Sequence, residues 1–78
     1  MCLSEWLVLA EQGREVDFYY KHEKYSISAN YNKWFLTKYG DFENAQEFGS
    51  FSELIYNSII NDVPFKEICS CFDIDAIY

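Results

Sequence analysis

The chain has 78 residues, of which 50% are hydrophobic and 21% aromatic, and it carries a net charge of −7. This length suits one domain, residues 1–78, and the hydrophobic content excludes a disordered chain. There is no apolar run of the about 18 residues that a membrane span needs, and no Lys or Arg precedes Leu7 as in a secretory signal. We therefore expect a single cytoplasmic domain.

The first predicted element is a helix over residues 3–12. Apolar residues recur from Leu3 to Ala10 at the spacing of one helical face. Ser4 is the expected N-cap, because its hydroxyl can accept from a free backbone N–H of the first turn. Gly13 is the expected end of the helix, since glycine adopts the left-handed conformation readily.

Three strands are predicted next, over residues 15–20, 25–29 and 33–39. The first two alternate apolar with polar residues, as half-buried strands do, and short polar turns connect all three into an antiparallel meander. The third strand carries large rings on both faces, among them Trp34 and Phe35. One of its faces is therefore expected either to lie under the N-terminal helix or to meet a partner, which includes a second copy of the chain in a homodimer.

The C-terminal half is predicted to be mainly helical. Residues 41–49 are acidic and irregular, with a short edge strand expected at most over 46–48. Ser50 and Glu53 have the spacing of a capping box and predict a helix that ends near Asn61 and Asp62. A further helix is expected over residues 64–72, where Pro64 suits the first turn. The tail, residues 73–78, is expected to form a short terminal strand or an extended arm.

These elements predict an α+β fold class. It comprises a short N-terminal helix, a three-stranded antiparallel meander and two C-terminal helices, with the helices packed on the sheet.

The net negative charge of the chain comes entirely from its C-terminal half. Residues 1–39 hold five acids and five bases, whereas residues 40–78 hold eight acids and one base. Such a field disfavours binding to nucleic acid phosphates and favours a basic protein surface. Glu53 belongs to a predicted cap, so the better candidates for partner binding are other acids. These candidates are Asp41, Glu43, Glu47, Asp73 and Asp75.

No motif indicates catalysis or a cofactor. His22 lies in a predicted turn, where a general base would have no cleft. The three cysteines lack the spacing of a zinc site, and the three glycines form no phosphate loop. We expect a protein that is not an enzyme and has no cofactor or metal.

An alternative interaction surface lies on the predicted meander. Aromatic rings with basic neighbours can stack nucleic acid bases and hold phosphates. The residues of this Lys/Tyr-rich sheet face are Tyr19, Lys21, Lys24, Lys33, Lys38 and Tyr39. The competing interpretation is that the lysines protect exposed strands from edge pairing.

Four segments, residues 17–21, 24–27, 34–39 and 50–54, resemble small uncharacterised proteins of low-GC Gram-positive bacteria and their phages. Proteins of this type include anti-CRISPR inhibitors, several of which act as DNA mimics that present acidic surfaces to the basic channel of an effector nuclease. The resemblance implies a non-enzymatic phage or mobile-element inhibitor. Its acidic half would engage a basic surface of a nucleic-acid-handling protein, and no catalytic residue is implied.

Overall fold

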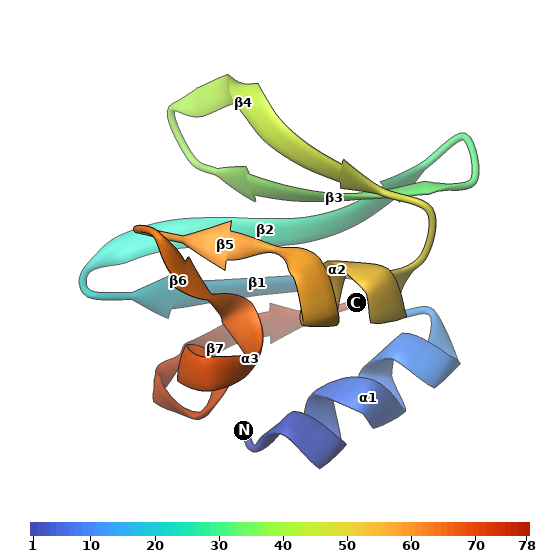
Figure 1. Ribbon diagram of the computed structural model, residues 1–78, viewed down its shortest axis with the longest axis horizontal. Helices are drawn as coiled ribbons and strands as arrows, with labels where there is room; N and C mark the ends of the chain where they lie inside the picture. Colours follow the sequence, from blue (N-terminus) through green and yellow to red (C-terminus); the bar gives the residue numbers. More distant parts are fainter.

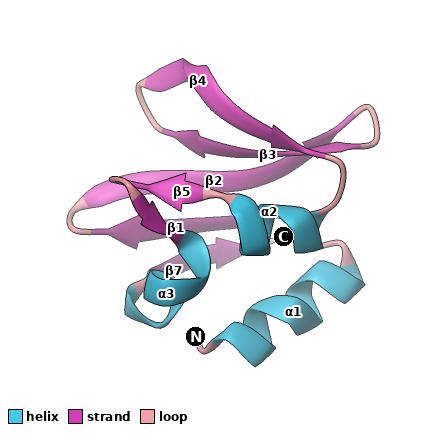
Figure 2. Ribbon diagram, in the orientation of Figure 1, coloured by secondary structure: helices cyan, strands magenta, loops and turns pink.

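The computed structural model describes all 78 residues and contains seven strands, three α-helices and one 3-10 helix (Figures 1 and 2). In chain order they are α1 (Leu3–Gln12), β1 (Val16–Tyr20), β2 (Glu23–Asn30), β3 (Lys33–Lys38), β4 (Asp41–Phe48), α2 (Phe51–Asn57), β5 (Ile59–Ile60), β6 (Val63–Pro64), α3 (Phe65–Ile68), η1 (Cys69–Cys71) and β7 (Asp73–Ile77). No helix is long and apolar enough to cross a bilayer.

The predicted fold class was wrong. The chain is a mixed α/β fold built on a five-stranded antiparallel sheet in the order β4-β3-β2-β1-β7, beside a separate β5-β6 hairpin. Residues 41–48, expected to be irregular, form the edge strand β4. The helix after Ser50 ends at Asn57, because residues 59–64 form the β5-β6 hairpin. The last predicted helix is reduced to the four residues of α3 followed by η1.

The N-terminal helix was predicted over the correct residues, but its N-cap was not. Cys2 holds the extended backbone of an N-cap, and its N–H donates to Glu5 Oε1 at 3.1 Å. This hydrogen bond lowers the pKa of Glu5, since it favours the carboxylate. Gly13 ends the helix in the left-handed conformation at φ 66°, as expected.

The three predicted strands of the meander are present and are joined by tight turns. Two-residue turns, Lys21-His22 and Tyr31-Asn32, connect them with positive φ at both positions. This conformation matches the natural twist of paired strands and makes a compact hairpin. The same turn recurs at Asn61-Asp62 in the β5-β6 hairpin.

The C-terminal tail is a strand and not an arm. β7 pairs antiparallel with β1, and the Tyr78 N–H extends the pairing by donating to Glu15 O at 2.8 Å. The Tyr78 hydroxyl donates to Asp17 Oδ2 at 2.8 Å, and Arg14 Nε donates to the Tyr78 carbonyl at 3.3 Å. The last residue of the chain is therefore held by the start of β1.

The hydrophobic core lies between one face of the sheet and the helices (Figure 1). Trp6 of α1 is fully buried, and its ring packs edge-on against Phe18, Phe65 and Phe72 with centroids 5.2–6.0 Å apart. The Trp6 indole N–H also donates to the Cys69 carbonyl at 3.2 Å. One side chain thus connects α1 with β1, α3 and η1.

Trp6→Phe is expected to lower the free energy of unfolding by about 2 kcal/mol. It removes buried ring volume and leaves the Cys69 carbonyl without its donor. Urea unfolding followed by circular dichroism measures the change. Val8→Ala on the exposed side of α1 is the control and should stay within about 0.5 kcal/mol of wild type. Equal effects of the two substitutions would contradict the central role of Trp6.

Stability is expected to fall at alkaline pH through the Tyr78 hydrogen bond to Asp17, which raises the pKa of the Tyr78 hydroxyl. The folded state holds this proton more tightly than the unfolded chain does. The contribution of this proton to folding stability is therefore complete below the ordinary tyrosine pKa of about 10. It is lost as the pH rises through the higher pKa of Tyr78 in the folded state. Burial also raises the pKa of Tyr25, so part of the alkaline loss is independent of Tyr78.

Urea midpoints measured between about pH 8 and pH 12 test this pH dependence. Tyr78→Phe should be less stable than wild type at pH 8 and should lose less stability on alkalinisation. Parallel pH curves for the two proteins would show that the Tyr78 proton is not linked to folding.

Candidate functional site

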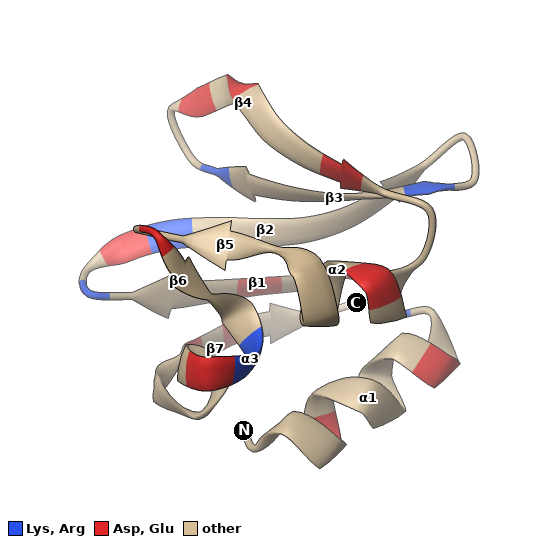
Figure 3. Ribbon diagram, in the orientation of Figure 1, with Lys and Arg blue, Asp and Glu red and all other residues tan.

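The five predicted partner-binding acids do not form one patch. Asp41, Glu43 and Glu47 lie on β4, whereas Asp73 and Asp75 lie on β7. These strands are the opposite edges of the sheet, about 19 Å apart at the usual strand spacing. Figure 3 shows acids near both ends of β4, at its turn with β3 and before α2. The structure therefore divides the predicted acids between two edges.

The β4 edge contains a large bulge next to the β3-β4 turn. Lys38 pairs with Asp41 and Leu36 pairs with Gln46, so the four residues 42–45 of β4 lie opposite the single residue Thr37 of β3. The Asn44 side chain donates to Asp41 Oδ1 at 2.7 Å across this bulge. Bulges redirect side chains and occur next to functional sites.

The bulge exposes an aromatic ring between two acids. Phe42 is 68% exposed and is flanked by Asp41 and Glu43, which are exposed as well. Its ring centroid lies 6.2 Å from that of Tyr39, which is 45% exposed. An apolar pair surrounded by charge is the composition of a protein-binding hot spot. We call Tyr39, Asp41, Phe42, Glu43 and Glu47 the β4 edge surface.

The acids of β7 have other neighbours. Asp75 Oδ2 lies 3.3 Å from Lys24 Nζ, and this ammonium lies over the rings of Tyr39 and Tyr19 at 4.6 and 5.9 Å from the centroids. Desolvation lowers the pKa of Lys24, but Asp75 together with Tyr39 and Tyr19 outweighs this effect, so the pKa lies above its ordinary value. Asp73 borders a wide, shallow hollow. The other residues of that hollow are Tyr19, Lys21 and His22.

The Lys/Tyr-rich sheet face is only partly assembled. Tyr19, Lys24 and Tyr39 meet on the sheet face away from the core, as the cation–π contacts show. Lys38 lies on the other face, where it pairs with Glu23 at 3.8 Å. Lys21 lies over the Tyr20 ring instead, at 5.5 Å. Two of the four lysines are thus paired with acids.

The aromatic strand 33–39 is internal to the sheet. β3 lies between β2 and β4, so neither of its edges can pair with another chain. Trp34 packs against Phe51 of α2 with centroids 4.7 Å apart, which assigns this side chain to the core. Only the opposite face of β3, with the half-buried Phe35, is left for a homodimer contact.

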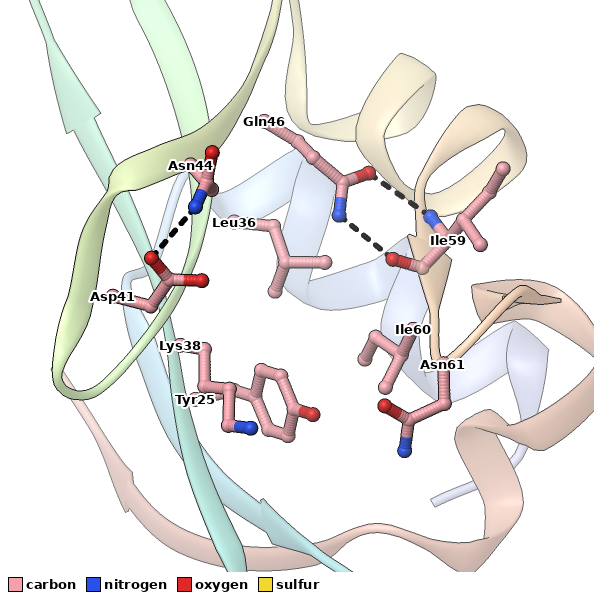
Figure 4. A pocket seen from close by; sticks show the side chains of 9 residues that line it. All are labelled: Tyr25, Leu36, Lys38, Asp41, Asn44, Gln46, Ile59, Ile60 and Asn61. Carbon is pink, nitrogen blue, oxygen red and sulfur yellow. Dashed lines mark hydrogen bonds between the residues drawn. The ribbon is translucent and has the colours of Figure 1, made fainter.

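A hollow of about 290 Å³ lies on the core side of β4, between this strand and the β5-β6 hairpin (Figure 4). Leu36 and Ile60 contribute apolar surface to it. The polar groups come from four parts of the chain: Tyr25 on β2, Lys38 on β3, Asp41, Asn44 and Gln46 on β4, and Asn61 in the β5-β6 turn.

Gln46 fixes the position of the hairpin that forms one wall of the hollow. Its Nε2 donates to the Ile59 carbonyl at 2.7 Å, and the Ile59 N–H donates to its Oε1 at 3.0 Å. The side-chain amide thus acts as a strand backbone would, and attaches β5 to β4 (Figure 4).

Tyr25 contributes a hydroxyl to the hollow. The residue is 5% exposed, and its hydroxyl makes no hydrogen bond within the chain. Burial raises the pKa of Tyr25, followed in effect by the nearby Glu23, so the group is protonated at neutral pH and can donate or accept. In Figure 4 the hydroxyl points into the hollow towards Asn61.

The cysteines lie apart from both surfaces. Cys69 is buried, which raises the pKa of its thiol, and its Sγ donates to the Lys66 carbonyl. Cys2 and Cys71 are exposed and unpaired. No group of three or more His, Cys, Asp or Glu side chains is arranged to hold a metal ion.

Sequence reasoning missed the residues that give this site its shape. Phe42, Gln46, Tyr25 and Asn61 were not among the candidates, because their roles depend on the bulge and on the β5-β6 hairpin. The one available signal in the sequence was Phe42, an aromatic residue that lies between Asp41 and Glu43 directly after the turn residue Gly40.

Comparison of the chain with protein-family models, with curated proteins and with solved structures gives no match.

Gln46→Ala is expected to loosen the β5-β6 hairpin. Loss of both hydrogen bonds to Ile59 should cost about 1–2 kcal/mol of unfolding free energy and should speed amide exchange at Ile59. Hydrogen exchange followed by NMR measures the second effect. Gln12→Ala on the exposed end of α1 is the control. An unchanged exchange rate at Ile59 in Gln46→Ala would rule out the attachment of β5 by this side chain.

Proposed function

We propose that this protein is a non-enzymatic interaction module whose β4 edge surface binds a basic surface of another protein. The observation that carries the proposal is the exposed Phe42–Tyr39 pair at an acidic bulge of an edge strand. The rings offer apolar area to bury, and the acids beside them select a basic partner and speed its approach.

The charges of the β4 edge surface support this role. No Lys, Arg or His lies within 4.0 Å of Asp41, Glu43 or Glu47, since the two salt bridges of the chain are Lys24–Asp75 and Lys38–Glu23. The three acids can therefore meet a partner's cations without first breaking a salt bridge within the chain. Asp75 is a weaker candidate because Lys24 already balances its charge.

The same charges weigh against the alternative of a nucleic-acid-binding module. Phosphate contacts need free Lys and Arg side chains, and Lys24 and Lys38 are both paired with acids. The remaining lysines near the meander, Lys21 and Lys33, lie in or beside the turns at its two ends.

An inhibitor of a nucleic-acid-handling protein, of phage or mobile-element origin and acting in the cytoplasm, is the specific form of the proposal. An acidic edge can occupy the surface that the phosphates of the nucleic acid would otherwise occupy. The resemblance to anti-CRISPR-type proteins in size and acidity favours this form, and the exposed free thiols suit a reducing compartment.

The triple charge reversal Asp41→Lys, Glu43→Lys and Glu47→Lys is expected to slow association with the partner at least tenfold at low salt, and less at high salt where charges are screened. Phe42→Ala should mainly speed dissociation, because it removes apolar contact. Surface plasmon resonance with a partner first isolated from the native host by pull-down measures both rates.

The matched control is a triple reversal of the same net charge at exposed acids away from β4: Glu11→Lys, Glu67→Lys and Asp73→Lys. It should change the association rate far less than the β4 triple variant. Equal slowing by both triples would mean that only the net charge matters, and unchanged binding by the β4 triple and Phe42→Ala would remove the β4 edge surface from the interface.

A further inference from the structure

We propose that the hollow between β4 and the β5-β6 hairpin receives one arginine side chain of the basic partner. The inference rests on the proposed function and names the anchoring contact. The hollow adjoins the β4 edge surface, since Asp41 belongs to both. A single segment of the partner can thus cover Phe42 and also place a side chain in the hollow.

The dimensions of the hollow suit one side chain. Its volume of about 290 Å³ lies just below the roughly 300–1,000 Å³ of pockets that enclose whole small molecules. Leu36 and Ile60 supply apolar surface, against which the methylene stem of a long basic side chain can pack.

Asp41, Tyr25 and Asn61 can each accept a hydrogen bond in the hollow. Asp41 Oδ1 is occupied by Asn44, while its second oxygen points into the hollow in Figure 4 and has no cation within 4.0 Å. Tyr25 as a residue is 5% exposed, and its hydroxyl, which makes no hydrogen bond within the chain, points into the hollow. Figure 4 places the Asn61 amide opposite it, on the other side of the hollow. A charged donor that reaches both this hydroxyl and the free Asp41 oxygen makes charge-assisted hydrogen bonds, which are stronger than neutral ones.

A guanidinium fits these acceptors better than an ammonium or an anion does. Its five N–H donors diverge in a plane and can reach acceptors on different walls, whereas an ammonium is a compact point charge. An anion would meet the free oxygen of Asp41. Lys38 also lines the hollow, but its ammonium is held by Glu23 at 3.8 Å, so the cation already present has its own counter-charge.

A small-molecule titration tests the proposal without the partner. ¹⁵N-labelled protein is titrated with N-acetyl-L-arginine methylamide and, as a matched neutral probe, with N-acetyl-L-citrulline methylamide. The arginine probe should bind in the ~millimolar range expected for one side chain and should shift the amides of Leu36, Gln46 and Ile60. The citrulline probe should bind at least tenfold more weakly, and the corresponding lysine probe should fall between them.

Substitutions in the hollow show how much each side chain contributes to the affinity for the arginine probe. Asp41→Asn should weaken arginine binding about tenfold and Tyr25→Phe about threefold, provided that urea midpoints show both variants to be folded. Lys38→Met should leave binding unchanged or strengthen it, since it removes a like charge. Glu67→Gln, on the exposed side of α3 and outside the hollow, is the control and should change the affinity less than twofold.

Three results would overturn the proposal: no shifts at about 20 mM arginine probe, equal binding of the citrulline probe, or a tenfold loss of affinity in Lys38→Met, which would indicate an anion or zwitterion site. The outcome is separable from that of the proposed function. If the arginine probe does not bind but the β4 triple variant associates slowly with the partner, only the anchoring contact is removed. If the probe binds but the triple variant associates with the partner as fast as wild type, the proposed interface is removed.

Discussion

The packing of three phenylalanine rings around Trp6 is the contact on which the rest of the structure depends. Trp6, Phe18 and Phe65 come from α1, β1 and α3, and Phe72 lies between η1 and β7; each ring centroid lies within 6.1 Å of the other three. A chain of 78 residues buries little surface, and this one has no disulfide, so large rings supply the buried area. Because these rings hold α1 and α3 to one face of the sheet, the helices do not cover the opposite face or the two sheet edges.

The β4 edge lies away from this cluster and is held by different forces. It pairs with β3 on either side of the bulge, and Gln46 attaches β5 to its core side. A four-residue bulge is tolerated there because the strand carries little of the core: of its eight residues, none is fully buried. The low burial of β4 therefore has two consequences: the strand tolerates the bulge, and Phe42 and the acids beside it stay exposed.

The distribution of charge follows the same division. At β7, Asp75 is balanced by Lys24, and Asp17 accepts from the Tyr78 hydroxyl, so these acids serve the end of the sheet. At β4, no cation lies within 4.0 Å of the acids, and Asp41 opens onto the hollow that Tyr25 and Lys38 also line. A net charge of −7 alone would serve solubility equally well at either edge. Asp73 of β7 is unpaired as well, so the proposed binding role of β4 rests on its unpaired acids together with the exposed Phe42 beside them.

The sequence by itself determined the elements whose signals are local. Periodicity predicts α1 and the three central strands, and the spacing of Ser50 and Glu53 predicts the start of α2, where Ser50 Oγ accepts from Glu53 N–H at 3.1 Å. The tertiary structure alone decided β4, the β5-β6 hairpin, the shortness of α3 and the pairing of β7. The acids of β4 mask the alternation of a strand, whereas the alternation of β7 is visible but does not show which strand it pairs with. Residues 59–64 become a hairpin because Gln46 supplies hydrogen bonds from outside that segment. The candidate site is built from these elements, so composition could predict its acidity but not the bulge or the hollow that give it form.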